Sequence, residues 1–228
     1  MIKKLAVAMC LMGFTLQAQA AEPASSTHTL RLAIGAEPTE GFDPMLGWSH
    51  GSYLLLHSPL LKQKADLSWH SYMLESYTHN ADGKEWILTL KKDLKFSDGS
   101  PLTAKDVVFS YNNAAASGGK VDMGNFAKAE EVNPLTVKIT LSSPQSTFIN
   151  VLGSLGIVSA DKYDAKTYAH KPIGAGPYRL VAFQPGQQLI VEQNPYYAGP
   201  KNDYGKMVFV FLDEDAAFAA APVSYTHL

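Results

Sequence analysis

The stretch DGKEWILTLKKDLKFSDGSPLTAKDVVFSY, residues 82–111, decides the fold of this chain. Asp82-Gly83 is a hairpin turn signal, and the residues from Glu85 to Lys91 that follow it read as a strand. Thr103-Ala104-Lys105-Asp106 has the spacing of a capping box, which predicts a helix that begins here and ends near Asn113. A strand, a turn and a helix in such quick succession indicate an α/β protein.

The same patterns continue on both sides of this stretch. Alternating polar and apolar residues predict a strand at 28–35, and the segment that contains Glu37, Pro38 and Pro44 is predicted to be an irregular loop. Pro185-Gly186 is predicted to be the turn of a hairpin. The remaining predicted strands are 135–141, 178–183, 188–192 and 206–212. The remaining predicted helices are 148–152 and a buried one in the apolar stretch 51–61, which Pro59 would end.

The composition is that of an ordinary globular protein. Of 228 residues, 46% are hydrophobic and 18% are charged, with 19 Lys+Arg against 21 Asp+Glu. The balanced charge gives no sign of a basic groove for nucleic acid. The single cysteine, Cys10, excludes an internal disulfide and a thiolate metal cage.

The first 20 residues are predicted to be a signal peptide. A cationic start, Met1-Ile2-Lys3-Lys4, precedes an apolar run and the small-x-small pattern Ala18-Gln19-Ala20. A membrane anchor fits less well because the run is short, and a lipoprotein acylated on Cys10 fits less well because Met9 occupies a position where a small residue is expected. We therefore expect a periplasmic protein of a Gram-negative cell.

The last seven residues, 222–228, read PVSYTHL. This is the translation of the end of a common transposon-based sequencing adapter. The expectation is that these residues are adapter read-through and that the natural chain is longer.

A catalytic alternative rests on Gly47-Trp48-Ser49-His50-Gly51, which matches the G-x-S-x-G pattern of serine hydrolases. That pattern needs a strand directly before the serine, and Pro44 disfavours a central strand there. The histidines show no spacing typical of a zinc site, so no metal site is expected.

Three blocks of sequence resemble one family. Residues 82–111 resemble its DG-x-x-W strand, K-F-x-DG turn and P-x-T-A-x-D-V helix, and residues 172–178 (PIGAGPY) resemble its P-x-G-x-G-P-Y block. Glu37-Pro38 and Phe42-Asp43-Pro44 resemble its opening E-P-x-x-L-D-P, with one extra residue and phenylalanine in place of leucine. The chain is thus similar to the family 5 extracellular solute-binding proteins of peptide and nickel ABC transporters.

The resemblance implies the periplasmic binding protein type II-like fold, α/β, with two lobes around a hinge. Members are more than twice as long as this chain, which would hold only the N-terminal lobe. By this similarity the chain divides into a signal peptide (1–20), a hinge-proximal domain (21–44 and 171–221), a second domain of the same lobe (45–170) and the adapter-like tail (222–228).

The resemblance also implies the function. Such proteins are not enzymes and need no cofactor; they capture a solute between the lobes and deliver it to a membrane permease. The ligand would be a small peptide or, as the alternative, a nickel chelate. Only Arg31 and Arg179 remain as arginines, and both fall in predicted strands, which favours a peptide over a chelate. The full-length protein is expected to be a monomer that does not bind nucleic acid.

Four residues are predicted to contact the ligand by this similarity. Trp48, His50 and Tyr53 follow the F-D-P turn, in the segment that lines the cleft in relatives, although core packing is an equal alternative for Tyr53. Glu37 and the backbone around it resemble the edge that pairs with an extended ligand.

Other prominent residues are given structural roles. Trp86 and Phe96 are expected to lie in the core. Gly174 and Gly176 are expected to permit a tight backbone turn.

Overall fold

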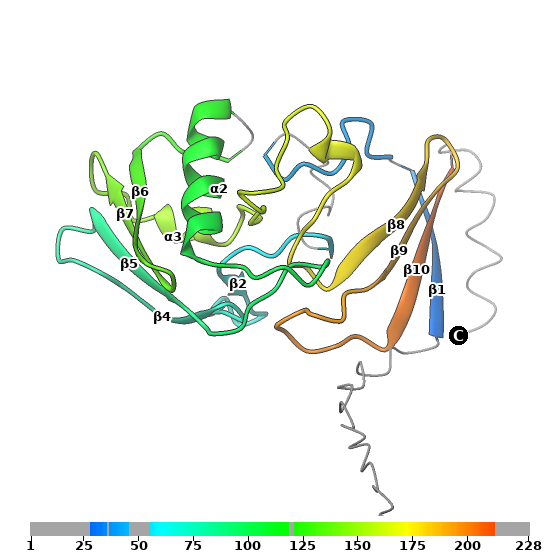
Figure 1. Ribbon diagram of the computed structural model, residues 1–228, viewed down its shortest axis with the longest axis horizontal. Coiled ribbons are helices and arrows are strands. Elements are labelled where there is room, and N and C mark those ends of the chain that lie inside the picture. Colours follow the sequence, from blue (N-terminus) through cyan, green and yellow to red (C-terminus); the bar gives the residue numbers. More distant parts are fainter. Residues whose placement is uncertain (1–27, 36, 46–54, 119–120, 213–228) are drawn as a thin grey trace, which may run out of the picture.

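The computed structural model describes residues 28–35, 37–45, 55–118 and 121–212 of the chain. The predicted signal peptide, the residues Trp48, Ser49, His50 and Tyr53, and the tail from 213 onward lie outside the described residues. Within the described residues, two four-stranded sheets lie at opposite ends of the molecule (Figure 1).

The first sheet is made of segments far apart in the sequence. Its strands are β1 (His28–Ile34), β8 (Tyr178–Gln184), β9 (Gln188–Gln193) and β10 (Tyr204–Phe211), in the order β1-β10-β9-β8. β1 runs parallel to β10, and the other pairs are antiparallel. All four predicted strands are confirmed, as is the hairpin turn, where Gly186 has φ 70°.

The second sheet is antiparallel throughout. Its strands are β4 (Leu74–His79), β5 (Glu85–Leu90), β6 (Phe126–Asn133) and β7 (Thr136–Leu141), in the order β4-β5-β7-β6. The helix α2 (Ala104–Ser117) packs against β6 and β7 (Figure 1). Shorter elements are β2 (Lys62–Gln63) paired with β3 (Trp69–His70), α3 (Phe148–Leu152) and the 3₁₀ turn η1 (Tyr168–His170).

The predicted capping of α2 is confirmed. The Asp106 carboxylate accepts the N–H of Thr103 at 2.8 Å through one oxygen and the N–H of Ala160 at 2.9 Å through the other. The helix extends beyond Asn113, where it was predicted to end. The alanines that follow favour continuation, and the helix stops at Gly118, whose φ of 62° is the left-handed conformation of a helix C-terminus.

Each sheet has its own hydrophobic core. The larger core lies between α2, the second sheet and α3, and it contains Trp86 and Phe96, as predicted. The smaller core lies on one face of the first sheet and contains Phe42, Leu56, Tyr178, Leu189, Val191 and Phe209.

The predicted helix, which Pro59 was expected to end, is wrong for His57 and Ser58, because residues 57–61 contain no helix. Backbone groups of this segment bond to distant parts of the chain. The Leu61 N–H donates to the carbonyl of Leu152 at 2.9 Å, and the Ser58 carbonyl accepts the N–H of Ile157 at 3.2 Å. These long-range bonds replace the local bonds that a helix would need, so the apolar composition reflects burial between segments.

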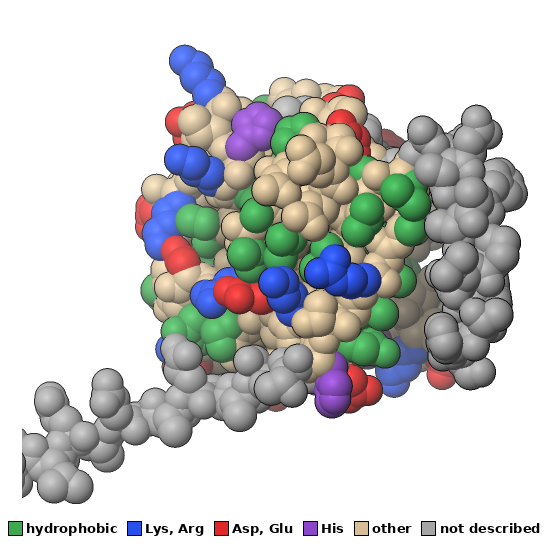
Figure 2. All heavy atoms as spheres, turned by 90° about the vertical axis from the view of Figure 1, so that its right-hand side faces the viewer, with side chains coloured by type: hydrophobic (Ala, Val, Ile, Leu, Met, Phe, Trp, Pro, Cys, Tyr) green, Lys and Arg blue, Asp and Glu red, His purple; other side chains and the backbone are tan. Residues whose placement is uncertain are grey.

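The surface agrees with the balanced composition. On the face shown in Figure 2, basic and acidic side chains lie interspersed. Among the described residues, no helix has both the length and the apolar character needed to cross a membrane.

Candidate functional site

The Phe42-Asp43-Pro44 turn is fixed by a buried carboxylate. Asp43 is only 1% exposed. One of its oxygens accepts the N–H of Met45 at 2.9 Å, and the other accepts the hydroxyl of Tyr163 at 2.7 Å. Burial, together with the neighbouring Asp43 carboxylate, raises the pKa of Tyr163 to about 12, so the phenol remains a neutral donor.

A second buried contact lies close by. The Tyr168 hydroxyl donates to the carbonyl of Ile173 at 2.8 Å and lies 2.9 Å from Nε2 of His57. Because the hydroxyl proton points to Ile173, Nε2 of His57 is assigned as the donor in the second contact. Burial also raises the pKa of Tyr168. His57 and Asp43 thus hold the chain on either side of the segment that was predicted to contact ligand.

The PIGAGPY block lies directly against the chain at Leu55 and Leu56. A Cβ on Gly174 would lie 1.9 Å from the carbonyl oxygen of Leu56, and one on Gly176 would lie 2.4 Å from that of Leu55. The Gly176 N–H donates to the Leu56 carbonyl at 2.9 Å. Neither glycine has a positive φ, and what requires glycine at both positions is the close contact between two backbones.

Glu37 is the one predicted ligand residue that the structure describes. Its Oε2 accepts the N–H of Gly186 at 2.6 Å, which ties the segment after β1 to the turn between β8 and β9. Residues 37–45 form turns and irregular backbone, with no strand.

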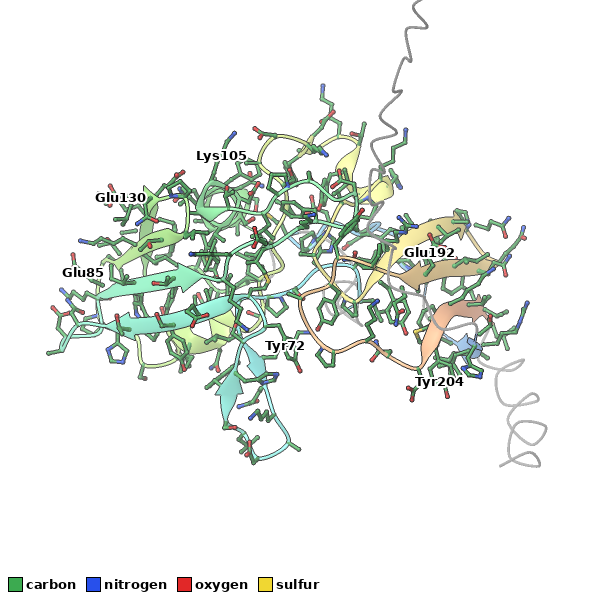
Figure 3. All side chains as sticks on the ribbon, turned by 60° about the horizontal axis from the view of Figure 1, so that its bottom comes forward. Tyr72, Glu85, Lys105, Glu130, Glu192 and Tyr204 are labelled. Atoms are coloured by element: carbon green, nitrogen blue, oxygen red, sulfur yellow. The ribbon has the colours of Figure 1, made fainter. Side chains whose placement is uncertain are left out.

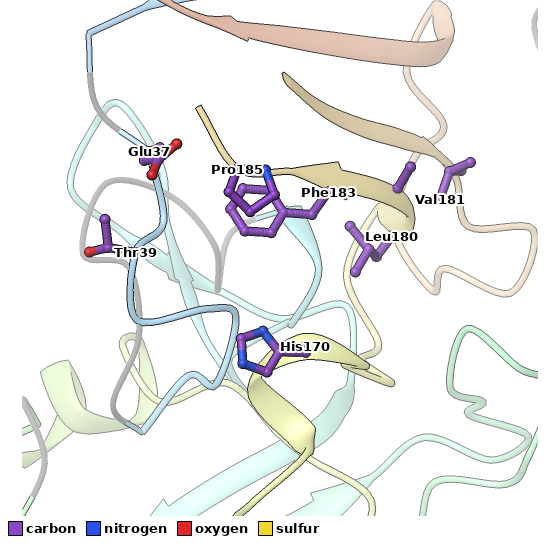
Figure 4. A pocket seen from close by; sticks show the side chains of 8 residues that line it. Glu37, Thr39, His170, Leu180, Val181, Phe183 and Pro185 are labelled. Atoms are coloured by element: carbon purple, nitrogen blue, oxygen red, sulfur yellow. The ribbon is translucent and has the colours of Figure 1, made fainter. Parts of the chain in front are cut away.

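A hollow of about 480 Å³ lies beside Glu37 (Figure 4). One side is the loop that carries Glu37 and Thr39, and the other is the edge strand β8, with His170 of η1 at one end. A register shift between Leu180 and Ala182 accompanies a Val181 side chain that is 50% exposed. The hollow therefore combines an apolar wall with a polar rim.

Sequence reasoning did not identify Thr39, His170 or the β8 residues as neighbours of Glu37. Their proximity depends on the Phe42 N–H, which donates to the carbonyl of Ala169 at 2.7 Å and brings the two segments together. The one available signal was Gly41, whose φ of 80° and close contact with Ala169 both require glycine.

Metal ligands do not gather in the described part of the chain. No group of three His, Cys, Asp or Glu side chains there could hold a metal ion.

Residues 69–224 match the family described as bacterial extracellular solute-binding proteins, family 5, middle region. The chain belongs to this family. The predicted resemblance is confirmed, and so is the fold class, which is that of the family 5 periplasmic binding proteins.

Two curated relatives show how much of the family this chain represents. A probable D,D-dipeptide-binding periplasmic protein of Escherichia coli is 32% identical over 158 residues, which is 64% of this chain and 30% of the relative. The glutathione-binding protein of Salmonella choleraesuis is 31% identical over 172 residues, which is 71% of this chain and 33% of the relative. The chain spans about a third of the length of these relatives.

Solved structures of periplasmic binding proteins share this fold. NikZ of Campylobacter jejuni, solved in complex with Ni(L-His), superposes with a TM-score of 0.79 and 23% identity over 86% of this chain and 42% of NikZ. The two curated relatives are named as binding proteins, and the matching family is one of extracellular solute-binding proteins.

Proposed function

We propose that this chain is the N-terminal part of the substrate-binding component of an ABC importer. The complete protein captures a small peptide or a similar solute between two lobes in the periplasm and delivers it to a membrane permease. The observation that carries the proposal is the family match over residues 69–224, supported by a TM-score of 0.79 to a solute-binding protein.

A peptide-like ligand is favoured by the curated relatives, which are named for a D,D-dipeptide and for glutathione. The two arginines also support it. Arg31 lies in β1 and Arg179 in β8, where the Arg179 side chain pairs with Glu192 at 2.7 Å, so this arginine is already engaged. The nickel-chelate alternative draws on the likeness to NikZ, which is a likeness of fold.

The proposed ligand contacts are Trp48, His50 and Tyr53, with Glu37 at the border of the site. Support comes from the hydrogen bond that the Met45 N–H donates to the buried Asp43 carboxylate, which fixes the chain just before their segment. Because the Glu37 carboxylate already accepts a backbone N–H, its role is to position this loop against β8 at the border of the hollow.

We also propose the domain division 21–44 with 171–221, and 45–170. Phe42 packs with the first sheet and Met45 with the larger core, which supports a boundary between them. By the same similarity, residues 1–20 direct export and the second lobe follows this chain.

The test is a calorimetric titration of the mature full-length protein with alanyl dipeptides, glutathione and nickel–histidine. We expect saturable, reversible binding of a peptide-class ligand, and none by residues 21–221 alone. Trp48→Ala should weaken binding at least tenfold. Tyr204→Ala, which removes an aromatic ring that is 41% exposed, is the matched control and should leave affinity unchanged. Binding of nickel–histidine alone would instead support the chelate alternative.

The hydrolase alternative is tested in the same preparation. Residues 41–45, which precede the Gly47–Gly51 motif, contain no strand, and a nucleophile elbow needs one directly before its serine. We expect no labelling of Ser49 by a fluorophosphonate in the folded protein.

A further inference from the structure

The hollow beside Glu37 opens into the smaller core. Leu180 and Phe183 line it, and both are partly buried against that core. The Phe183 ring packs edge-on against Phe42, with the ring centres 5.3 Å apart. One wall of the hollow is therefore apolar surface that the described residues cover only in part.

An extra residue in β8 creates this wall. Leu180 pairs with Val191 and Phe183 pairs with Leu189, and both partners are buried in the smaller core. Residues paired directly across two strands point to the same face, so Leu180 and Phe183 share a face although they are three residues apart. The register shift after Leu180 makes this possible, because in a regular strand they would face opposite sides. Such bulges are common at sheet edges and beside active sites, where they redirect a side chain.

The borders of the hollow are held in place by hydrogen bonds. Glu37 accepts the N–H of Gly186 at 2.6 Å, which joins the loop to the hairpin turn. The Phe42 N–H donates to the carbonyl of Ala169 at 2.7 Å, which joins the loop to the 3₁₀ turn that carries His170. The hollow is thus already formed, and a ligand that enters it has little ordering left to bring about.

Polar groups face β8 across the hollow. They are the Glu37 carboxylate, the Thr39 hydroxyl and the His170 imidazole (Figure 4). Together they offer both donors and acceptors of hydrogen bonds. An apolar pocket with a few polar groups at its border, and with a volume of about 480 Å³, is the usual form of a small-molecule site.

We propose that the hollow receives an aliphatic side chain of the peptide-like ligand, so that the complete protein prefers peptides with a leucine-sized apolar residue. This inference rests on the proposed function, which supplies a ligand of the peptide class. In a peptide each side chain is flanked by amide groups, which matches an apolar wall that faces a polar rim. A polar side chain of the same size would lose its hydrogen bonds to water against Leu180 and Phe183.

The test is a calorimetric titration of the mature full-length protein with five dipeptides. They are alanyl-alanine, leucyl-alanine, alanyl-leucine, asparaginyl-alanine and alanyl-asparagine. Asparagine has nearly the size of leucine, so this comparison separates polarity from volume. It needs no variant, and it therefore tests the inference whatever the stability of the variants.

Three variants locate the selecting surface. Leu180→Ala removes part of the wall, and Leu180→Ile keeps it apolar. Leu32→Ala is the matched control, because Leu32 pairs with Phe209 on the same face of the first sheet but lies in β1, at the opposite edge from β8. Figure 3 labels Tyr204 of β10 and Glu192 of β9, the two strands that separate these edges. Melting temperatures are measured on the same samples.

We expect at least one leucine dipeptide to bind the wild type about tenfold more tightly than alanyl-alanine and than its asparagine counterpart, as for a partly buried leucine side chain. Leu180→Ala should reduce this advantage to less than about threefold and change the affinity for alanyl-alanine by less than about twofold. Leu180→Ile and Leu32→Ala should keep the wild-type advantage.

Three results would overturn the inference. A wild type without a leucine advantage would show that the hollow does not receive the ligand, as when another segment of the complete chain fills it. An advantage that Leu180→Ala leaves intact, or that Leu32→Ala reduces equally, would place the selecting surface elsewhere. Binding of glutathione or nickel–histidine without binding of any dipeptide would also overturn it, although the binding role would stand. A wild type that binds none of these ligands would instead refute the proposed function.

Discussion

Replacing Gly174 by alanine tests the close contact between the PIGAGPY block and the backbone at Leu56. The new Cβ would lie 1.9 Å from the carbonyl oxygen of Leu56, whereas real Cβ atoms essentially never come within 3.0 Å of another atom. The neighbour is backbone and cannot rotate away. The two segments must therefore separate by more than 1 Å.

That separation breaks specific hydrogen bonds. The Gly176 N–H donates to Leu56 at 2.9 Å, and the Ser97 N–H donates to the Gly174 carbonyl at 2.8 Å. A buried polar group left without a partner costs about 1–3 kcal/mol, so losing both bonds gives a destabilisation of about 4 kcal/mol. This is a large share of the roughly 5–15 kcal/mol that stabilises a typical domain.

The assay is urea unfolding of the full-length protein, combined with hydrogen exchange at the Gly176 amide. We expect a lower unfolding midpoint and lost protection of that amide. Gly35→Ala is the control, because a Cβ there meets no atom within 4 Å and the residue has no positive φ. It should change stability by less than about 1 kcal/mol. If Gly174→Ala changed stability as little as Gly35→Ala, the close-contact account of this block would be wrong.

Three further outcomes are expected. Asp106→Ala removes the acceptor of two backbone N–H groups at the start of α2 and should cost about 3 kcal/mol, measured by urea unfolding. Arg179→Ala breaks an exposed pair with Glu192 and should cost less than about 0.5 kcal/mol in the same assay; a cost above 1 kcal/mol would contradict this reading. Tyr163 has a pKa near 12 in the folded state and near 10 when unfolded. Its contribution to the free energy of unfolding is therefore complete below pH 10 and is lost as the pH rises to 12. Because the phenol is partly exposed, this contribution is about 1 kcal/mol. Tyr163→Phe should therefore lose less stability than the wild type between pH 10 and 12. An equal loss of unfolding free energy with pH in both proteins would contradict this prediction.

The sequence predicted those strands and helices whose own residues show alternating burial or a capping motif. β5 buries alternate residues Trp86, Leu88 and Leu90, and the capping box marks the start of α2. The strand β6 was missed because only Ala129 is buried in it, Phe126 is half-buried and the other side chains are exposed. Its place is set by β7 and by Asn112, whose side-chain amide bonds both the N–H and the carbonyl of Ala129. Such a partner cannot be recognised from the strand's own residues.

The site was predictable only through its motifs. The F-D-P turn and the PIGAGPY block were recognised, yet the reason for Gly174 became clear only when Leu56 was seen against it. The sequence did not predict that the Glu37 carboxylate accepts the N–H of Gly186, 149 residues away. Contacts of this kind depend on tertiary structure, which local patterns do not encode.

The central claim is that the complete protein closes two lobes around a solute. Small-angle X-ray scattering of the mature full-length protein, with and without a saturating alanyl dipeptide or glutathione, measures this closure directly. The account predicts a smaller radius of gyration with the ligand that calorimetry shows to bind. At a ligand concentration near the wild type's dissociation constant, Trp48→Ala should show a smaller decrease than the wild type. A bound ligand that leaves the radius of gyration of the wild type unchanged would contradict it.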